Sequence, residues 1–467
     1  MEAISTILAQ DLQKESISNT DKKIKFLLIS PTSPLWRIER NQKPSNSKVF
    51  RFSMLPSLCV AASMPPNVET QILDEDVEPI DFETDAELIG ITFMTYNAPR
   101  AYEIADRFRS LGKTVIFGGY HPSFMPDEAI EHADSICIGE SENNVPQMIK
   151  DYLNGELKNI YKNELFDLKN LPVLDRSLLH KNAYITTNVL QATRGCYHRC
   201  AFCSVAAFNR YQIRTRPVGR VIDELKTLGK DVLFMDDNIT LDKDYAKELF
   251  KAMAPLKKRW YSQSGISIAE DNELLELAVK SGCKGLFLGF ESLSQKSLGA
   301  YKKHCNRKRD YVEVANKLHD KGIAIFAAFV FGSDEDEIDV FENTLNFLLE
   351  ANIEVLQSTR LTPFPGTPLF DNLDKDGRII DKDWSHYDFF NVVHKPLNMT
   401  PEELHRGTAW LQKQFFSGKN IARRIWRASS YLSPVMVFKI VLPVNLGYRH
   451  KLTSYGAFKM GSNFNLN

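Results

Sequence analysis

Three cysteines in one short stretch carry the strongest chemical signal in this chain. Cys196, Cys200 and Cys203 are spaced C-x3-C-x2-C, and the next cysteine, Cys283, lies far along the chain. Three thiolates can bind a [4Fe-4S] cluster and leave its fourth iron without a protein ligand, whereas clusters that only transfer electrons are normally closed by a fourth cysteine. The spacing therefore predicts a cluster whose open iron binds a substrate or cofactor.

Two other interpretations of these cysteines stay open. A structural zinc could take the three thiolates and His198, although His198 lies between two of them and is too close in sequence to complete a tetrahedral site easily. The three could also be ordinary buried cysteines of a reducing compartment. Seven cysteines in 467 residues would seldom produce this spacing by chance, so both alternatives are less favoured.

The loop resembles the cluster motif of the radical S-adenosylmethionine (SAM) superfamily, C-x3-C-x-aromatic-C, with Phe202 at the aromatic position. The resemblance implies that the three cysteines bind a [4Fe-4S] cluster and that the open iron chelates the amino and carboxylate groups of SAM, with Phe202 beside it. In that superfamily, reduction cleaves SAM to methionine and a 5′-deoxyadenosyl radical. An electron donor such as flavodoxin or ferredoxin is then an expected partner.

The second half of the chain must position this loop. Apolar runs of strand length alternate there with helical periodicity, and the loop follows the first of them directly. Six βα repeats indicate a partial (β/α)6 barrel over residues 185–370, whose active site should collect at the carboxyl ends of the strands. The expected strands are 185–192, 232–235, 261–266, 285–290, 323–330 and 355–361.

Polar residues end several of these strands where an apolar run would otherwise continue. Glu291, for example, is an acid at the end of an apolar strand, a costly position unless something polar faces it. The resemblance implies that these residues contact SAM, whose ammonium group needs acceptors. Helix caps and turns are the alternative, since Asp and Asn commonly precede helices. The candidates are Asp236, Asp237, Asn238, Ser262, Glu291, Ser292 and Gly332.

The first half of the chain shows a separate series of strands and helices. Their alternation predicts an α/β, Rossmann-like domain over residues 21–155, with a parallel sheet covered by helices and ligands at the carboxyl ends of its strands. The expected strands are 24–30, 68–73, 88–93, 115–117 and 135–138. The residues at their ends are Thr95, Asn97, Gly118, Gly119, His121, Gly139 and Glu140.

The turn that begins Gly118-Gly119-Tyr-His121, together with the later Gly139-Glu140-Ser-Glu142 strand end, resembles the cobalamin-binding domain of the cobalamin-dependent radical SAM enzymes. The resemblance implies cobalamin as a further cofactor, held by the strand-end residues. A tight strand-to-helix turn would explain the glycine pair by itself. Other cobalamin domains carry D-x-H-x-x-G after the first strand, but residues 31–40 contain no histidine, so no lower axial histidine ligand is expected.

The remaining segments are expected to be a flexible tail (1–20), a linker (156–184) and a mostly helical C-terminal cap (371–467). No Asp or Glu follows Glu403, and basic residues there alternate with aromatic ones. This composition predicts either a helical cap packed on the barrel or a helix at a membrane surface. The net charge of −1 gives no reason to expect nucleic-acid binding. A cytoplasmic enzyme, with possible peripheral membrane contact through the tail, is expected because the sequence shows no signal peptide and no long apolar run.

The combined motifs favour a cobalamin-dependent C-methyltransferase that acts on an unactivated carbon of a small-molecule, lipid or peptide substrate. In methylating members of that family SAM serves twice, once to remethylate cobalamin and once to yield the radical. The first alternative is a non-methylating cyclase, coupling or rearrangement enzyme with a relic cobalamin domain. The second is an iron-sulfur sensor or binding module that never cleaves SAM.

Overall fold

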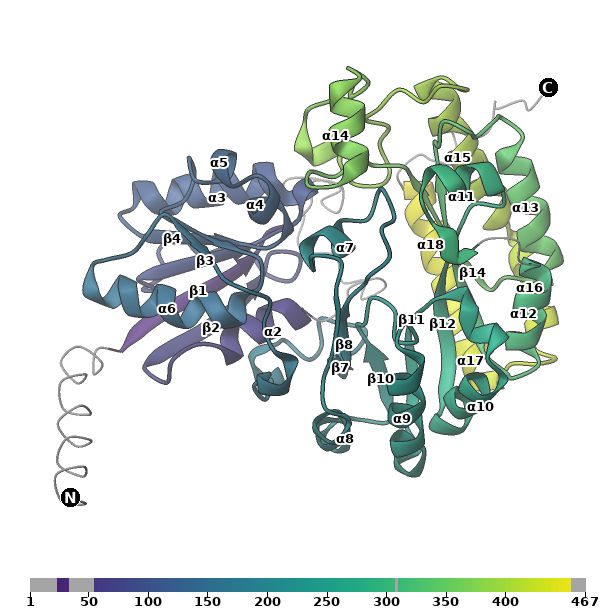
Figure 1. The fold of residues 1–467 in the computed structure, drawn as a ribbon, viewed down its shortest axis with the longest axis horizontal. Helices are drawn as coiled ribbons and strands as arrows, with labels where there is room; N and C mark the ends of the chain where they lie inside the picture. The colour runs from purple at the N-terminus through teal and green to yellow at the C-terminus, as the bar shows by residue number, and fades with distance from the viewer. Residues whose placement is uncertain (1–22, 33–53, 307–309, 455–467) are drawn as a thin grey trace. The chain divides into compact units, whose positions relative to one another are not determined.

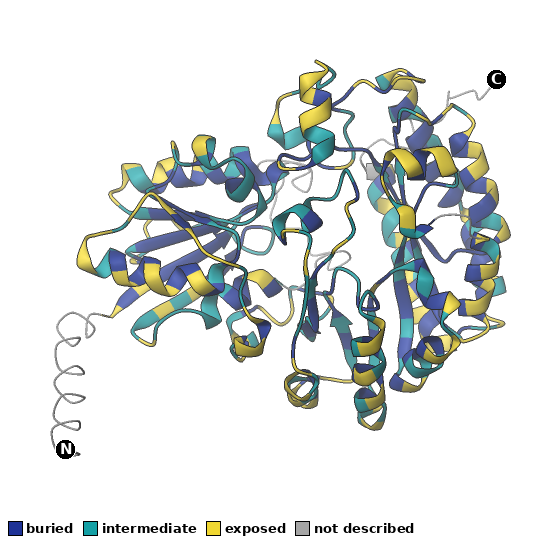
Figure 2. Ribbon diagram, in the orientation of Figure 1, coloured by how far each residue is buried: buried dark blue, intermediate teal, exposed yellow. Residues whose placement is uncertain are grey.

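The computed structural model describes residues 23–32, 54–306 and 310–454, so the expected tail 1–20 and most of the segment 31–40 lie outside the described residues. The chain divides into two compact units (Figure 1). The first comprises residues 1–45, 56–166 and 172–179, and the second comprises 46–55, 167–171 and 180–467. In both units the strands are mostly buried and the helices expose one side (Figure 2).

The first unit is built on a six-stranded parallel sheet of order β2-β1-β3-β4-β5-β6. This order confirms the Rossmann-like expectation. The order of successive strands across the sheet reverses between β1 and β3, which is where such sheets bind ligands. The short strand β6 was missed because three residues with one buried side chain leave no apolar run, and it lies within the expected linker. The strands are β1 (Ile24–Ser30), β2 (Val68–Asp74), β3 (Leu88–Thr92), β4 (Thr114–Gly118), β5 (Ser135–Ile138) and β6 (Ile160–Lys162).

Helices cover both faces of this sheet because their apolar residues recur at helical spacing. In α3 (Ala98–Ser110) the buried set Ala101, Ile104, Ala105 and Phe108 forms one stripe. On the other face, α6 packs Val145, Met148 and Ile149 against alternate residues of β1. The remaining helices are α2 (Leu55–Ala62), α4 (Tyr120–Phe124), α5 (Pro126–Ala129) and α6 (Ser141–Asn154).

The second unit contains a six-stranded parallel sheet of order β14-β13-β12-β11-β10-β7. Each strand pairs with the one before it in this series, and β7 and β14 do not pair with each other within the described residues, so the barrel is partial, as expected. Its strands are β7 (Val189–Leu190), β10 (Asp231–Phe234), β11 (Arg259–Ser264), β12 (Cys283–Glu291), β13 (Ala324–Phe331) and β14 (Val355–Arg360). The helices that follow are α8 (Val218–Thr227), α9 (Lys243–Met253), α10 (Asn272–Ser281), α11 (Gln295–Ala300), α12 (Tyr311–His319) and α13 (Val340–Glu350).

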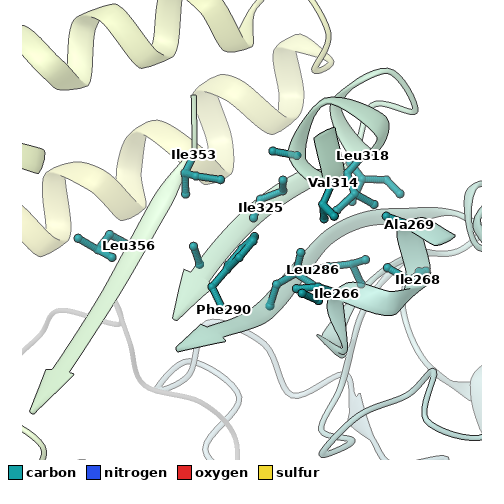
Figure 3. Packing of buried hydrophobic residues seen from close by; sticks show 14 of the residues in the cluster. Ile266, Ile268, Ala269, Leu286, Phe290, Val314, Leu318, Ile325, Ile353 and Leu356 are labelled. Atoms are coloured by element: carbon teal, nitrogen blue, oxygen red, sulfur yellow. The ribbon is translucent and has the colours of Figure 1, made fainter. Parts of the chain in front are cut away.

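The two faces of the barrel strands differ in burial. Alternate residues such as Leu286, Phe290, Ile325 and Leu356 point toward the helices and belong to one large apolar core (Figure 3). The residues between them face the inside of the barrel. Gly285, Ala324 and Val355, near the amino-terminal ends of their strands, are buried, and the rest, here called the inner set, are partly buried or exposed. This inner set is Tyr261, Gln263, Phe287, Gly289, Phe326, Ala328, Val330, Gln357 and Thr359. The interior of the barrel is therefore not filled by its own side chains.

The C-terminal helices belong to the barrel unit. Helix α15 packs on α13 and β14, and residues 428–441 pack on Ala324 and Tyr261 at the amino-terminal end of the inner face. Tyr448 adds a ring contact to Phe326, with centroids 6.1 Å apart. These residues form a floor below the barrel interior. The helices are α14 (Pro368–Lys375), α15 (Pro401–Phe415), α16 (Gly418–Ala428), α17 (Pro434–Met436), the π-helical turn η8 (Val437–Val441) and α18 (Leu442–Ser454).

Among the described residues, no helix is both long and apolar enough to cross a membrane.

The floor below the barrel interior is held by a buried carboxylate, Glu354, which precedes β14 and is 0% exposed. It accepts hydrogen bonds from the Ile325 amide at 2.7 Å and from the Tyr431 hydroxyl, and His319 Nε2 lies 3.3 Å away. Asn445 donates to the Glu354 carbonyl at 3.0 Å. One residue thereby joins β13, α12 and the C-terminal helices.

Replacing Glu354 with alanine should destabilise the second unit by about 3 kcal/mol, because the donors around it lose their buried acceptor. Limited proteolysis should then release the residues after 428 before the rest of the barrel unfolds. Glu350→Ala, at an exposed carboxylate of α13, is the matched control and should leave the digestion pattern unchanged. Equal protease resistance of both variants would show that Glu354 does not hold the floor.

Candidate functional site

The cysteine loop is held in a β-hairpin beside the first barrel strand. Its first strand, β8 (Thr193–Gly195), pairs antiparallel with β9 (Ile213–Thr215), and α7 (Ser204–Phe208) follows the third cysteine. Gly195 directly precedes Cys196 and has φ +90°, and a Cβ there would lie 2.2 Å from the Gln212 carbonyl oxygen. Only glycine fits this turn without strain.

Two carboxylates from the end of β10 bind the backbone that enters the loop. Asp236, 0% exposed, accepts from the amides of Ala192 at 3.0 Å and Thr193 at 2.5 Å and from the Thr193 hydroxyl at 2.8 Å. Asp237 accepts from the Gly195 amide at 2.8 Å. Burial raises the pKa of Asp236 to about 7 although these donors lower it. Both acids thus fix the approach of the chain to Cys196.

The middle of the loop is bound from two sides. The Ala201 amide donates to the Tyr301 carbonyl at 2.9 Å, and the Ala201 carbonyl accepts from the Leu369 amide at 3.0 Å. Phe202 packs edge-on against the Tyr301 ring, with centroids 5.3 Å apart. Phe202 therefore anchors the loop to the end of α11, which is a packing role that the sequence alone did not reveal.

The three cysteines have free thiols, with Cys200 buried and Cys196 and Cys203 partly buried. Burial raises the pKa of Cys196 to about 11 and that of Cys200 to about 12, and it also raises that of Cys203. Within the described residues, no three His, Cys, Asp or Glu side chains converge on one metal-ion position. A [4Fe-4S] cluster needs no such convergence, because each of three irons takes one thiolate. The donor chemistry of the loop fits that cluster.

The other polar residues proposed for SAM lie at the same end of the sheet, and several are engaged by the protein itself. Asn238 Oδ1 accepts from the Gly265 amide at 3.0 Å and so ties β10 to β11. The Ser262 hydroxyl donates to the Phe234 carbonyl at 3.2 Å. Ser292 Oγ accepts from the Ser294 amide at 3.1 Å, which leaves its hydroxyl hydrogen for another partner.

Glu291 and Lys303 form an ion pair at the carboxyl end of β12. Lys303 Nζ lies 2.8 Å from Glu291 Oε1, and the side chains are 18% and 9% exposed. Burial lowers the pKa of Lys303, whereas the negative charge of Glu291 raises it. The net result is that the pKa of Lys303 lies above its ordinary value. Lys303 was not predicted from the sequence, because a lysine after a short helix carries no pattern.

Gly332 follows β13 in a conformation that favours glycine, with φ +108°, and a Cβ there would lie 2.7 Å from Leu404. Its amide donates to Asp336 at 3.0 Å, and its carbonyl accepts from His394 at 3.1 Å. Asp336 also accepts from the Ser297 hydroxyl at 2.7 Å. Asp336 was not singled out from the sequence, although it lies in the acidic run that follows the strand.

The candidates for cobalamin binding lie at the carboxyl end of the first unit's sheet. Three of the candidate side chains form hydrogen bonds to other residues of that unit. Asn97 donates to the Pro31 carbonyl at 3.0 Å, and His121 Nε2 lies 3.0 Å from the Tyr102 hydroxyl. Glu140 accepts from the Phe166 amide at 2.7 Å. Thr95 is 4% exposed and begins a short 3-10 turn. These contacts shape the rim of the sheet.

The glycines at this rim differ in what surrounds them. A Cβ on Gly119 would lie 2.6 Å from the Phe93 carbonyl oxygen, so the fold itself requires this glycine. A Cβ on Gly118 would meet its nearest neighbour at 3.8 Å, and one on Gly139 would meet nothing within 4 Å. The backbone at Gly118 and Gly139 is therefore accessible along the strand ends. Such open backbone fits a large flat cofactor.

Replacing Asp236 with asparagine should reduce iron binding. The amide nitrogen would bring hydrogens against the donors of Ala192 and Thr193, at a cost of about 1 to 3 kcal/mol, and the loop would shift. We expect reconstituted D236N to bind at least fivefold less iron per chain than the native protein. Asp244→Asn, exposed on α9, is the control. Normal iron content in D236N would show that the carboxylate is not needed to hold the loop.

Comparison with known proteins places both units in recognised families. The model for the radical SAM superfamily matches residues 190–348, and the model for the B12 binding domain matches residues 55–149. The solved structure of the radical SAM methyltransferase TsrM from Kitasatospora setae, with cobalamin and a [4Fe-4S] cluster bound, is similar in fold, with a TM-score of 0.63 and 14% identity over 94% of this chain and 99% of that one.

Two curated relatives come from Chlorobaculum tepidum. Bacteriochlorophyllide d C-12(1)-methyltransferase is 33% identical over 90% of this chain and 92% of its own length. Bacteriochlorophyllide d C-8(2)-methyltransferase is 31% identical over 76% of this chain and 82% of its own. With identity of this level along nearly the whole chain, and with both family models in the expected order, this protein belongs to the cobalamin-dependent radical SAM enzymes, which use a [4Fe-4S] cluster, SAM and cobalamin.

Proposed function

We propose that this radical SAM methyltransferase adds a methyl group to an unactivated carbon of a large, planar, mainly apolar small molecule of the chlorophyllide type. The enzyme class follows from the family. The substrate class rests on one observation, the unfilled inner face of the barrel, where none of the side chains from β11 to β14 that point inward at mid-strand is fully buried.

The inner face has the chemistry that such a substrate needs. Phe287 and Phe326 present rings whose centroids lie 5.6 Å apart, and Gly289 and Ala328 leave room above them. Flat aromatic surfaces stack on such rings with a gain of about 0.5 to 1.5 kcal/mol per pair beyond area burial. Gln263 and Gln357 add hydrogen-bonding groups at intermediate or high exposure. The relatives named for bacteriochlorophyllide d support the same class of substrate.

The second unit would hold the cluster and SAM, and the first unit would hold cobalamin. The cysteines Cys196, Cys200 and Cys203 would hold the cluster, and Asp237, Glu291, Ser292 and the backbone at Gly332 would line the SAM site beside it. Gly118 and Gly139 would lie against cobalamin. When bound, the cluster delivers the electron that cleaves SAM, and cobalamin carries the methyl group. The protein's own task is to orient these groups and to exclude water around them, and an electron donor such as flavodoxin or ferredoxin supplies the reducing electrons.

Anaerobic enzyme reconstituted with iron, sulfide and cobalamin, and supplied with SAM and reduced flavodoxin, should convert bacteriochlorophyllide d to a product heavier by one methylene unit. One SAM should leave as S-adenosylhomocysteine and a second as methionine and 5′-deoxyadenosine. Mass spectrometry of the three products is the measurement. Release of 5′-deoxyadenosine with a changed product of unaltered carbon count would favour the non-methylating alternative. Absence of 5′-deoxyadenosine with every substrate offered would favour the sensor.

Ala328→Trp tests the barrel interior directly. The added ring should fill space that the substrate needs and lower kcat/KM at least tenfold, about 1.4 kcal/mol, with iron content unchanged. Ala422→Trp, on the exposed side of α16, is the matched control. Equal activity of both variants would place the substrate outside the barrel interior.

We also propose that the C-terminal helices contact an anionic membrane surface. Trp426 is 79% exposed, Phe438 59% and Leu446 49%, and Lys419 and Lys439 are exposed on the same helices. No acid follows Glu403. Exposed aromatic residues among bases are typical of helices that lie at a lipid surface. Asp320 and Glu350 line a cavity with Trp426 and Arg427. Because these two carboxylates repel anionic lipid headgroups, the attraction of the protein to the membrane should be weaker there than around Lys439.

The variant W426S/F438S should bind vesicles of phosphatidylcholine and phosphatidylglycerol at least tenfold more weakly than the native chain in co-sedimentation, since each buried aromatic contributes about 1.5 to 3 kcal/mol. Leu397→Ser, at a residue that is 66% exposed before α15, is the control. Equal binding of the native protein to vesicles of phosphatidylcholine alone would exclude the electrostatic part of the proposal.

A further inference from the structure

The ion pair of Lys303 and Glu291 lies on an unusual piece of backbone. Glu291 has φ +64°, and the pairing of β12 with β13 shifts register between Gly289 and Glu291. A non-glycine residue in this left-handed conformation is strained, and it persists only where the surrounding structure imposes it. Strain of this kind is concentrated at functional sites, so the placement of the Glu291 carboxylate has a purpose beyond strand pairing.

The position of Lys303 is fixed as firmly as that of Glu291. The Lys303 amide donates to the Leu298 carbonyl at 2.9 Å, which ends α11. Asn306, 1% exposed, donates to the carbonyls of Gly289 at 2.8 Å and Phe290 at 2.9 Å and thereby joins the lysine's turn to β12. The ammonium is held at the strand end rather than left mobile in solvent.

Gly289 shows where the pair lies. A Cβ at this position would lie 2.3 Å from Glu291 Oε1 and 3.1 Å from Lys303 Nζ. Gly289 belongs to the inner set of the barrel, so the ion pair lies over the inner face at the end that carries the cysteine loop. The glycine leaves the space that the pair fills.

The turn that carries Lys303 contacts the cysteine loop directly. The carbonyl of Tyr301, two residues before Lys303, accepts at 2.9 Å from the amide of Ala201, which lies between Cys200 and Cys203, and the Tyr301 ring packs on Phe202. An ammonium fixed beside the loop favours negative charge placed among its cysteines. In a partly buried site such an interaction is much stronger than in water.

We propose that Lys303, held by Glu291, is a positioning residue that sets the reduction potential of the [4Fe-4S] cluster. Reduction adds one electron from the donor to the cluster and moves no other group. A fixed cation nearby stabilises the reduced form more than the oxidised form and so raises the potential. Glu291 holds the ammonium in place and limits its effect by its own negative charge. The inference rests on the assignment of the cluster to Cys196, Cys200 and Cys203.

Electron paramagnetic resonance during a redox titration of the reconstituted, SAM-free full chain tests this role. Lys303→Met should lower the potential so that the ratio of reduced to oxidised cluster at a fixed potential falls about tenfold, which is roughly 59 mV for a one-electron couple. Lys303→Arg, which keeps the charge, should restore the native value. Glu291→Gln should shift the potential in the opposite direction. Lys302→Met, exposed and adjacent in sequence, is the matched control and should cause no shift.

Iron content and SAM affinity separate the outcomes. An unchanged potential in K303M with full iron content would overturn the proposal. If that variant, with its potential unchanged, had a larger dissociation constant for SAM, Lys303 would be a SAM contact instead. If K303M bound no iron, E291Q would decide, since it keeps the ammonium and must raise the potential. Retention of the cluster by the triple alanine variant of the cysteines would refute the cluster assignment itself, whatever the effect of Lys303.

Discussion

A buried carboxylate that binds backbone amides is the contact on which the cysteine loop depends. Asp236 has no access to solvent and receives hydrogen bonds from consecutive residues just before the loop. The cost of burying its charge is offset only while all those donors stay in place, and the donors are positioned only while the carboxylate is there. The Asp236 carboxylate thus joins the end of β10 to the β8–β9 hairpin, and the carboxylate and the amides that it binds depend on each other. This contact acts together with the packing of Phe202 on Tyr301, which anchors the middle of the loop.

The same logic operates at the opposite end of the barrel. Parallel strands place all their carboxyl ends on one side, where the polar residues gather, and leave the other side to be closed by whatever the chain supplies. Here the C-terminal helices supply it, through Glu354 and the contacts to Ala324 and Tyr261. The space between the cysteine loop and this floor is lined by residues that are only partly buried. That combination distinguishes the barrel from a closed one filled by its own side chains.

The helices and strands could be predicted from the sequence where the spacing of apolar residues and the length of each apolar run were clear. All six barrel strands were expected, and β12 and β13 most clearly, since each is an apolar run between helical segments. By contrast β6, with one buried residue in three, gave no signal. The roles of the strand-end residues were harder to predict. Asp236 and Asn238 were singled out as SAM contacts, but their oxygens accept from the protein's own backbone, a choice that depends on amides more than 20 residues away. Lys303 could not be found, because its importance comes from a strained residue twelve positions earlier.

The floor of the barrel has a consequence for how the enzyme is made. Residues 428–448 are synthesised after every strand of the sheet they cover, so the inner face lacks its floor while the ribosome completes the chain. Ala324, Tyr261 and Phe326 are left uncovered in that interval, and the last two are aromatic. Exposed aromatic strands of this kind are the surfaces on which incomplete chains associate with one another. Slowing translation ahead of the C-terminal helices would therefore be expected to reduce the yield of soluble enzyme without altering a single residue that touches a cofactor.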